Sequence, residues 1–248
     1  MAAAHRSSEV QPGRKTADAH SQMKITEISR PQSLTDQAYQ HLKAAIRSGA
    51  IEQHFFYPLG EMAAGFGISR TPVREAVLKL AHEGLLEILP QRGFRIREVA
   101  PEEAAEVFEL RNLLEGRTVE KLARKSDPEE LRKLRAILAR QERLVNEPRR
   151  FLEVDEEFHL TMLELAGFRR AREFIVMLRD VIWLLGIKAL SAPGRLEGVL
   201  SEHNRIVECI ARKDAAAARR ALRAHLDSTF RTIQQDRAAK VDRSARDG

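Results

Sequence analysis

Asp155 and His159 lie four residues apart, a spacing that places two side chains on the same face of a helix. Two further histidines, His203 and His225, follow later, and no other histidine occurs beyond residue 100. Neutral imidazoles and a carboxylate suit a divalent metal, Zn²⁺ first, with Ni²⁺ or Mn²⁺ as alternatives. Spacing alone favours a plainer interpretation, three unrelated helix histidines and a solvated aspartate. The residue types therefore predict a metal site only if three helices converge.

A second group of side chains suits nucleic acid. Arginine can donate two parallel hydrogen bonds to guanine, and hydroxyls and free N–H groups of a first helical turn suit phosphate oxygens. Arg92 and Gly93 lie in a turn, where a missing side chain would let the backbone approach a groove. The alternative is an ordinary capped helix with solvated arginines and a structural hairpin. The candidate contacts at the start of the expected helix are Ser69, Arg70, Thr71 and Arg74.

The elements that would carry these arginines are three helices and a hairpin. Apolar residues at helical spacing predict the helices, and Pro72 fits a first helical turn. Two short apolar runs around Pro90–Gly93 predict a β-hairpin, and Ala100-Pro101 marks a boundary. This order predicts a winged helix-turn-helix over residues 33–99. The expected helices cover residues 33–49, 58–66 and 69–84, and the expected strands cover 85–89 and 94–99.

Everything after Pro101 has helical periodicity. The fold class is therefore mainly α, with the winged unit followed by an all-α bundle of about six helices over residues 102–237. Residues 1–32 lack apolar periodicity and are expected to form a disordered leader, and 238–248 form a tail. The six expected helices cover residues 102–125, 128–146, 150–166, 169–190, 195–212 and 214–237, the last capped by Asp214.

Composition excludes several classes of protein. The single cysteine, Cys209, rules out an internal disulfide framework and a multi-thiolate zinc finger, and it is expected to be a small buried side chain. The chain contains no run of eighteen apolar residues and no apolar signal core, which predicts no membrane association and a cytoplasmic location. A net charge of +6 permits a nucleic-acid partner without identifying one.

Residues 33–99 resemble the DNA-binding domain of GntR-type bacterial transcription regulators. The run from Ser69 to Ala76, SRTPVREA, is highly specific to that family. The resemblance implies that Arg70, Thr71 and Arg74 contact operator DNA and that Gly93 lies at the wing tip. Gln53-His54 replaces the family's usual Pro-Gly turn after the first helix. Gly60 stands where some members have a basic DNA contact.

Residues 102 to about 237 resemble the FCD effector domain of the FadR-type GntR subfamily. With six expected helices rather than seven, the domain resembles the shorter, VanR-like, metal-dependent version of the FCD domain. Gly167-Phe168 stands where a Gly-Asn pair is common. In metal-dependent members one aspartate and three histidines bind the ion at the bottom of a cavity. The resemblance therefore implies the ligand set Asp155, His159, His203 and His225. The matching motifs are Glu109-Leu110-Arg111 with Glu115, Asp155-xx-Phe158-His159, Glu202-His203 and Ala224-His225-Leu226.

Arg111 has two interpretations that the sequence leaves even. Its guanidinium can grip the carboxylate of an anionic effector, or it can pair with Glu115 one helical turn away. Trp183 and Met177 are expected to pack in the core or to line the cavity.

The leading hypothesis is a homodimeric transcription regulator that binds a pseudo-palindromic operator and responds to a small carboxylate. The effector would change the affinity for DNA because it binds two arrangements of the protein unequally. Repression is the expected mode, although the residues do not determine the sign of regulation. Two alternatives remain at this stage: a metalloenzyme using the same ligands, and a metal-free regulator with a larger ligand.

Overall fold

The computed structural model describes residues 32–53, 55–125, 127–190 and 192–246, apart from the side chains of 188 and 236–246. Residues 1–31 of the expected leader 1–32, and His54 of the expected unusual turn, lie outside the described residues. Among the described residues, no helix is long and apolar enough to cross a membrane.

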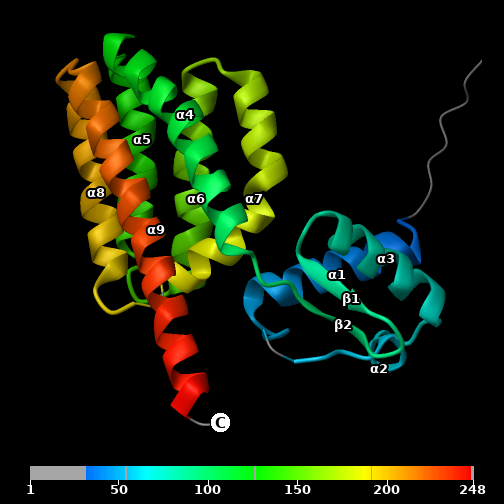
Figure 1. The fold of residues 1–248 in the computed structure, drawn as a ribbon. Coiled ribbons are helices and arrows are strands. Elements are labelled where there is room, and N and C mark those ends of the chain that lie inside the picture. The colour runs from blue at the N-terminus through cyan, green and yellow to red at the C-terminus, as the bar shows by residue number, and fades with distance from the viewer. Residues whose placement is uncertain (1–31, 54, 126, 191, 247–248) are drawn as a thin grey trace, which may run out of the picture. The chain divides into compact units, whose positions relative to one another are not determined.

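The winged unit has the predicted order of elements (Figure 1). Helix α1 packs on α3 through Leu42 and Ile46 against Val77 and Leu80, all of which are buried. The two short strands pair antiparallel, with Leu86 opposite Ile96. The elements are α1 (Leu34–Ser48), α2 (Leu59–Phe66), α3 (Arg70–His82), β1 (Leu86–Leu89) and β2 (Gly93–Ile96).

Gly93 is needed for a reason other than the expected close approach to DNA. It is the first residue of β2 and has φ +117°, a conformation that favours glycine. A Cβ atom here would lie 2.2 Å from the carbonyl oxygen of Tyr57. Tyr57 forms a β-bridge with Phe94, and the two rings stack at 5.7 Å. Gly93 therefore lets the segment before α2 pack against the hairpin.

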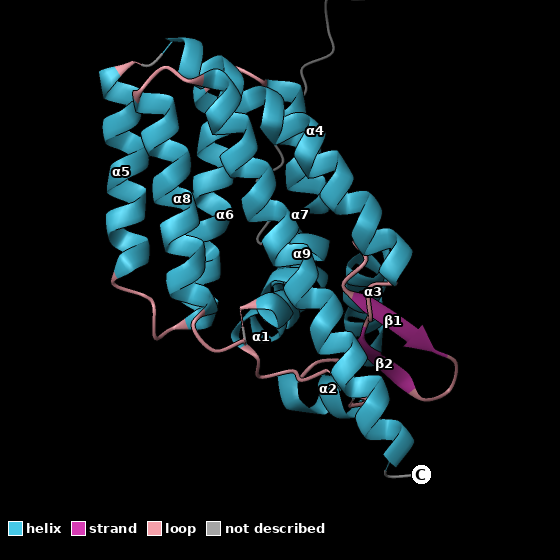
Figure 2. Ribbon diagram, turned by 60° about the vertical axis from the view of Figure 1, so that its left-hand side comes forward, coloured by secondary structure: helices cyan, strands magenta, loops and turns pink. Residues whose placement is uncertain are grey.

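The second domain consists of six helices, as predicted, and its core is built from their apolar faces (Figure 1). Helix α4 packs most extensively against α9, and α6 contacts α4, α5 and α7. Figure 2 shows that, among the described residues, the hairpin is the only sheet. The helices are α4 (Pro101–Lys125), α5 (Pro128–Glu142), α6 (Pro148–Leu165), α7 (Arg169–Ala189), α8 (Arg195–Ala211) and α9 (Ala215–Arg246).

Two predicted helix ends were wrong. Helix α5 ends at Glu142 rather than at 146. The prediction was too long because Leu144 and Val145 continue the apolar pattern, although they lie in the turn after the helix and pack on a small core cluster. Helix α9 continues to Arg246 rather than ending at 237, since no glycine or proline interrupts the expected tail before the last residue. Its start is as predicted: the Asp214 carboxylate accepts a hydrogen bond from the Ala217 N–H at 2.8 Å.

Three further expectations concern single side chains. Cys209 and Trp183 are buried, as predicted. Met177 is 73% exposed, so its expected place in the core or the cavity was wrong. It lies on α7 between residues that face inward, and helical spacing alone did not identify which face of α7 is covered.

Candidate metal and effector site

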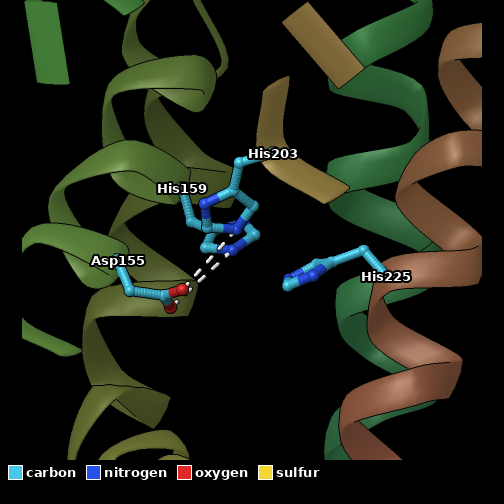
Figure 3. Close-up of side chains that lie close together, drawn as sticks. All are labelled: Asp155, His159, His203 and His225. Carbon is cyan, nitrogen blue, oxygen red and sulfur yellow. Dashed lines mark ion pairs between the residues drawn. The ribbon is translucent and has the colours of Figure 1, made fainter. Parts of the chain in front are cut away.

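Four predicted ligand residues from three helices meet inside the second domain (Figure 3). Helix α6 supplies Asp155 and His159, α8 supplies His203, and α9 supplies His225. One possible ligand atom of each residue lies within 4.8 Å of the others. Asp155 Oδ1 is 3.5 Å from His203 Nε2, and Asp155 Oδ2 is 3.8 Å from His159 Nε2. The plainer interpretation required three histidines that lie apart, whereas these three lie together.

The Nδ1 atom of each imidazole faces a different polar side chain. His203 Nδ1 lies 2.9 Å from Gln141 Oε1, and His225 Nδ1 lies 2.7 Å from Glu202 Oε2. His159 Nδ1 lies 2.6 Å from Glu115 Oε2, an ion-pair contact that is not aligned as a hydrogen bond. An acceptor at Nδ1 favours the tautomer that carries its proton there, which leaves a lone pair on Nε2. Nε2 of His203 and of His225 is therefore free to act as a ligand, and the charge of the Glu115 carboxylate favours the same tautomer in His159.

Two of the imidazole Nε2 atoms are buried without a hydrogen-bond partner. Nε2 of His159 and of His203 are buried and form no hydrogen bond with any described residue. A buried polar atom without a partner costs about 1–3 kcal/mol, so native structures rarely keep one without a reason. Three imidazole nitrogens and a carboxylate oxygen form a donor set that a divalent metal prefers. These residues therefore fit a metal ion.

The site disfavours protonation of His203 and His225. Burial lowers the pKa of His203 well below 6.5, and the neighbouring His225 and His159 lower it further. Burial likewise lowers the pKa of His225, although its hydrogen bond with Glu202 opposes the shift. Neutral imidazole is the form that binds metals. The lowered pKa of both rings therefore favours the form that a metal needs.

Two buried carboxylates beside the histidines remain ionised. Burial alone would raise the pKa of Glu202, but hydrogen bonds from His225 and Arg195 lower it to about 2. Burial would likewise raise the pKa of Glu115, but the charges of Arg111 and His159 hold it well below its usual range. Both carboxylates are therefore ionised at neutral pH and can act as hydrogen-bond acceptors for an imidazole N–H.

A narrow pocket opens beside the candidate ligands Asp155 and His159. The space between its walls is about 360 Å³, part of it open to solvent. The pocket is lined by Arg111, Leu152, Asp155, Glu156, His159, Leu160, Ile175, Arg179, Ile182 and Trp183.

Arg111 satisfies both of its sequence interpretations. Its Nε donates to Glu115 Oε1 at 2.7 Å, the ion pair expected one helical turn away. The same side chain lines the pocket, and its two terminal nitrogens form no hydrogen bond with any described residue. The ion pair therefore orients the guanidinium without using the edge that would grip a carboxylate.

Sequence reasoning missed the groups that hold the histidines. Gln141 on α5 has an ordinary helical context, and nothing in its spacing points to His203, 62 residues away. Arg195 donates from both terminal nitrogens to Glu202, and one of them also contacts Thr229. The only signal was the position of Glu202 next to His203 in the chain.

The predicted DNA contacts lie on the surface of the winged unit. Ser69, Arg70, Thr71, Arg74 and Arg92 are all exposed. Ser69 precedes α3 without a side-chain capping bond, and its hydroxyl is therefore available.

The six basic residues between 69 and 97 divide into two sets. Three are neutralised by neighbours: Lys79 pairs with Asp36, Arg95 with Glu87, and Arg97 with Glu103. The other three, Arg70, Arg74 and Arg92, pair with no acidic group among the described residues. The unpaired cations are thus those at the start of α3 and in the turn of the hairpin.

Two family models match this chain. Residues 34–96 match the model for bacterial regulatory proteins of the gntR family, and residues 106–228 match the model for the FCD domain. The two matches fall on the winged unit and on the helical domain that holds the four ligand residues.

Similar proteins are described as regulators. An uncharacterized HTH-type transcriptional regulator in an unstable DNA locus of Streptomyces ambofaciens is 31% identical over 190 residues, covering 75% of this chain and 79% of that protein. The HTH-type transcriptional repressor RspR of Escherichia coli is 26% identical over 88% of this chain and 96% of its own length. A putative GntR regulator from Rhodococcus has the same fold, with a TM-score of 0.71 at 21% identity, over 82% of this chain and 99% of that one.

Proposed function

Because this chain belongs to the GntR family of bacterial transcription regulators and carries an FCD domain, we propose that its DNA binding is controlled by a metal-bound organic acid. Asp155, His159, His203 and His225 would hold one divalent metal, Zn²⁺ in first place. Arg111 and the metal together would hold a small carboxylate. The protein is a DNA-binding regulator rather than an enzyme, as its relatives are.

The charge of the site is the observation that supports an anionic effector. Three carboxylates, Asp155, Glu115 and Glu202, face two guanidiniums, Arg111 and Arg195. Metal binding requires the three histidines to be neutral, so the protein groups then carry one excess negative charge, and a divalent ion turns this into one excess positive charge. A buried unpaired charge is costly, and one carboxylate would neutralise it.

The two arginines of the pocket differ in burial. Arg179 is partly exposed, and its Nε lies 3.8 Å from Asp180 Oδ1, while Glu156 pairs with Arg47 at 2.5 Å. Arg111 is the buried cation of the pocket and has free donors, and a guanidinium grips a carboxylate through two parallel hydrogen bonds. Four protein ligands leave room for a further donor on an ion of five or six coordination. The narrow pocket argues for a small acid over a larger ligand.

For the DNA-binding half, we propose that α3 reads the operator. Ser69, Arg70, Thr71 and Arg74 would contact bases and phosphates, and Arg92 of the hairpin turn and Gly93 at the start of β2 would contact the flanking groove. A homodimer would present two such units to a pseudo-palindromic operator. Repression is the proposed mode, because RspR of Escherichia coli and NanR of Cronobacter sakazakii are named repressors.

Calorimetry on full-length protein tests the effector site. Mono- and dicarboxylates are titrated into Zn²⁺-loaded protein and into protein stripped with a chelator, after elemental analysis of protein purified without chelator. We expect one metal per chain and an acid that binds the loaded form at least tenfold more tightly. Equal affinity with and without metal would make the ion structural only and contradict the proposal. Absence of any bound metal would favour the metal-free alternative.

A further inference from the structure

We infer that Glu115 is a positioning residue of the metal centre, which acts on the metal through His159 while its second oxygen holds Arg111. This inference rests on the proposed metal site, because it assigns a role to a residue that is not itself a ligand. Glu115 lies on α4, a helix that contributes none of the four candidate ligands.

The geometry connects the two halves of the effector site through one carboxylate. Glu115 is fully buried, with Oε2 2.6 Å from His159 Nδ1 and Oε1 2.7 Å from Arg111 Nε. His159 is a ligand candidate, and Arg111 is the buried cation of the pocket. A side chain that contacts both determines how far the guanidinium lies from the metal.

Comparison with a second carboxylate, Glu202, shows what distinguishes Glu115. Glu202 also lies between a histidine and an arginine, His225 and Arg195. Arg195, however, binds Glu202 through both terminal nitrogens and also contacts Thr229, and it does not line the pocket. Arg111 spends only Nε on Glu115. Of the two arrangements, only the one through Glu115 ends in a cation that faces the pocket.

A carboxylate at Nδ1 strengthens the opposite nitrogen as a ligand. An anionic acceptor raises the basicity of the imidazole and fixes its orientation, and loss of such a partner typically weakens metal binding about 10–100-fold. His203, whose Nδ1 faces the neutral Gln141, lacks this effect. We therefore assign His159 and His225 as the stronger histidine ligands and Glu115 as the group that makes His159 one of them.

The test measures Zn²⁺ affinity on the full chain by competition with a chromophoric chelator. Glu115→Gln removes the charge at nearly constant volume, and we expect its Zn²⁺ affinity to fall about 10–100-fold. The visible absorption bands of Co²⁺-loaded protein should change as well, because they report the ligand field and not general stability. Glu106→Gln, an exposed position on the same helix, is the matched control and should leave both readouts unchanged.

Two further variants keep the test decisive if Glu115→Gln folds poorly. Arg111→Gln retains the Glu115 charge, and we expect it to bind Zn²⁺ at least as tightly as the wild type. The double variant Arg111→Gln, Glu115→Gln removes both buried charges together, which avoids an unpaired ion in the core. The Zn²⁺ affinity of the double variant should fall below that of Arg111→Gln by the same factor by which Glu115→Gln falls below the wild type.

The outcomes separate this inference from the proposed function. A wild-type chain that binds no divalent metal would overturn both. A wild type that binds Zn²⁺, together with a Glu115 variant of equal affinity and unchanged Co²⁺ bands, would overturn only the role of Glu115. An Arg111→Gln variant that loses as much affinity as Glu115→Gln would attribute the effect to the ion pair as a whole, which also contradicts the inference.

Discussion

Lys43 Nζ lies 2.6 Å from Asp180 Oδ2, and the two side chains are only 9% and 6% exposed. This buried ion pair joins α1 of the winged unit to α7 of the helical domain. One turn further along α1, Arg47 pairs with Glu156 and lies 4.1 Å over the ring of Trp183. Both of these partners line the pocket. The walls of the candidate effector site therefore contact the first helix of the DNA-binding unit directly.

Replacing Asp180 should destabilise the protein strongly. Asp180→Asn leaves the buried Lys43 ammonium with Glu83 as its one remaining anionic partner. Breaking a buried pair in this way costs about 3 kcal/mol of unfolding free energy. The free energy of unfolding in urea measures the loss. Asp227→Asn, which breaks the exposed pair with Arg223, is the control and should cost less than about 1 kcal/mol. Equal losses in the two variants would contradict the importance of burial.

Glu83 should make stability depend on acid pH. Burial alone would raise its pKa, but hydrogen bonds from Lys43 and Tyr39 lower it below the usual 4.5. A lowered folded-state pKa means that the stabilisation is present above pH 4.5 and is lost as the pH falls below that value through the folded pKa. The difference in unfolding free energy between wild type and Glu83→Gln should therefore shrink from pH 7 to pH 3. A constant difference would show that the charge of Glu83 contributes nothing.

Trp183 should report effector binding directly. It is the single tryptophan of the chain and lines the pocket. A carboxylate that enters Zn²⁺-loaded protein should change its emission, and Arg111→Met should weaken that binding at least tenfold, since a hydrogen bond to a charged group contributes about 1.5–3 kcal/mol. Arg117→Met, exposed on the same helix, is the control. Unchanged affinity in the Arg111 variant would remove this residue from the effector site.

The unpaired arginines of α3 should carry operator binding. Arg70→Ala and Arg74→Ala should each cost about 1–3 kcal/mol if they contact bases, and a phosphate contact should instead reduce the salt dependence of binding. Fluorescence anisotropy on genomic fragments beside the gene measures both effects. Lys79→Ala lies on the same helix and serves as the control, because Lys79 already pairs with Asp36. Wild-type affinity in the double arginine variant would contradict the assignment.

Metal should stabilise the native fold through the three histidines. Zn²⁺ at a hundred times its dissociation constant should add about 2.7 kcal/mol, because binding to the native state alone shifts unfolding by mass action. Thermal melts with Zn²⁺ and with a chelator should differ in the wild type and in the control His41→Ala, an exposed histidine of α1. The difference should vanish in His203→Ala. Its persistence in a His159→Ala, His203→Ala double variant would refute the proposed ligand set.

Local patterns in the amino-acid sequence are enough to predict the helices and the residues of the candidate sites. Apolar periodicity located all six helices of the second domain, because a helix buries one face and the pattern is local. The run from Ser69 to Ala76 located the expected DNA-reading helix, and the spacing of Asp155 and His159 placed both on one face of α6. Each of these inferences depends on residues within a few helical turns of one another.

Tertiary structure alone decided which faces meet. Periodicity says that a helix has an apolar face, but packing against distant segments determines where that face points. The convergence of α6, α8 and α9, and the contact of Gln141 with His203 from 62 residues away, depend on such packing. The same reason explains the wrong prediction for Met177, whose side of α7 faces solvent. It also explains why Arg111 could be both an ion-pair partner and a pocket residue, because only the placement of its free edge distinguishes the two roles.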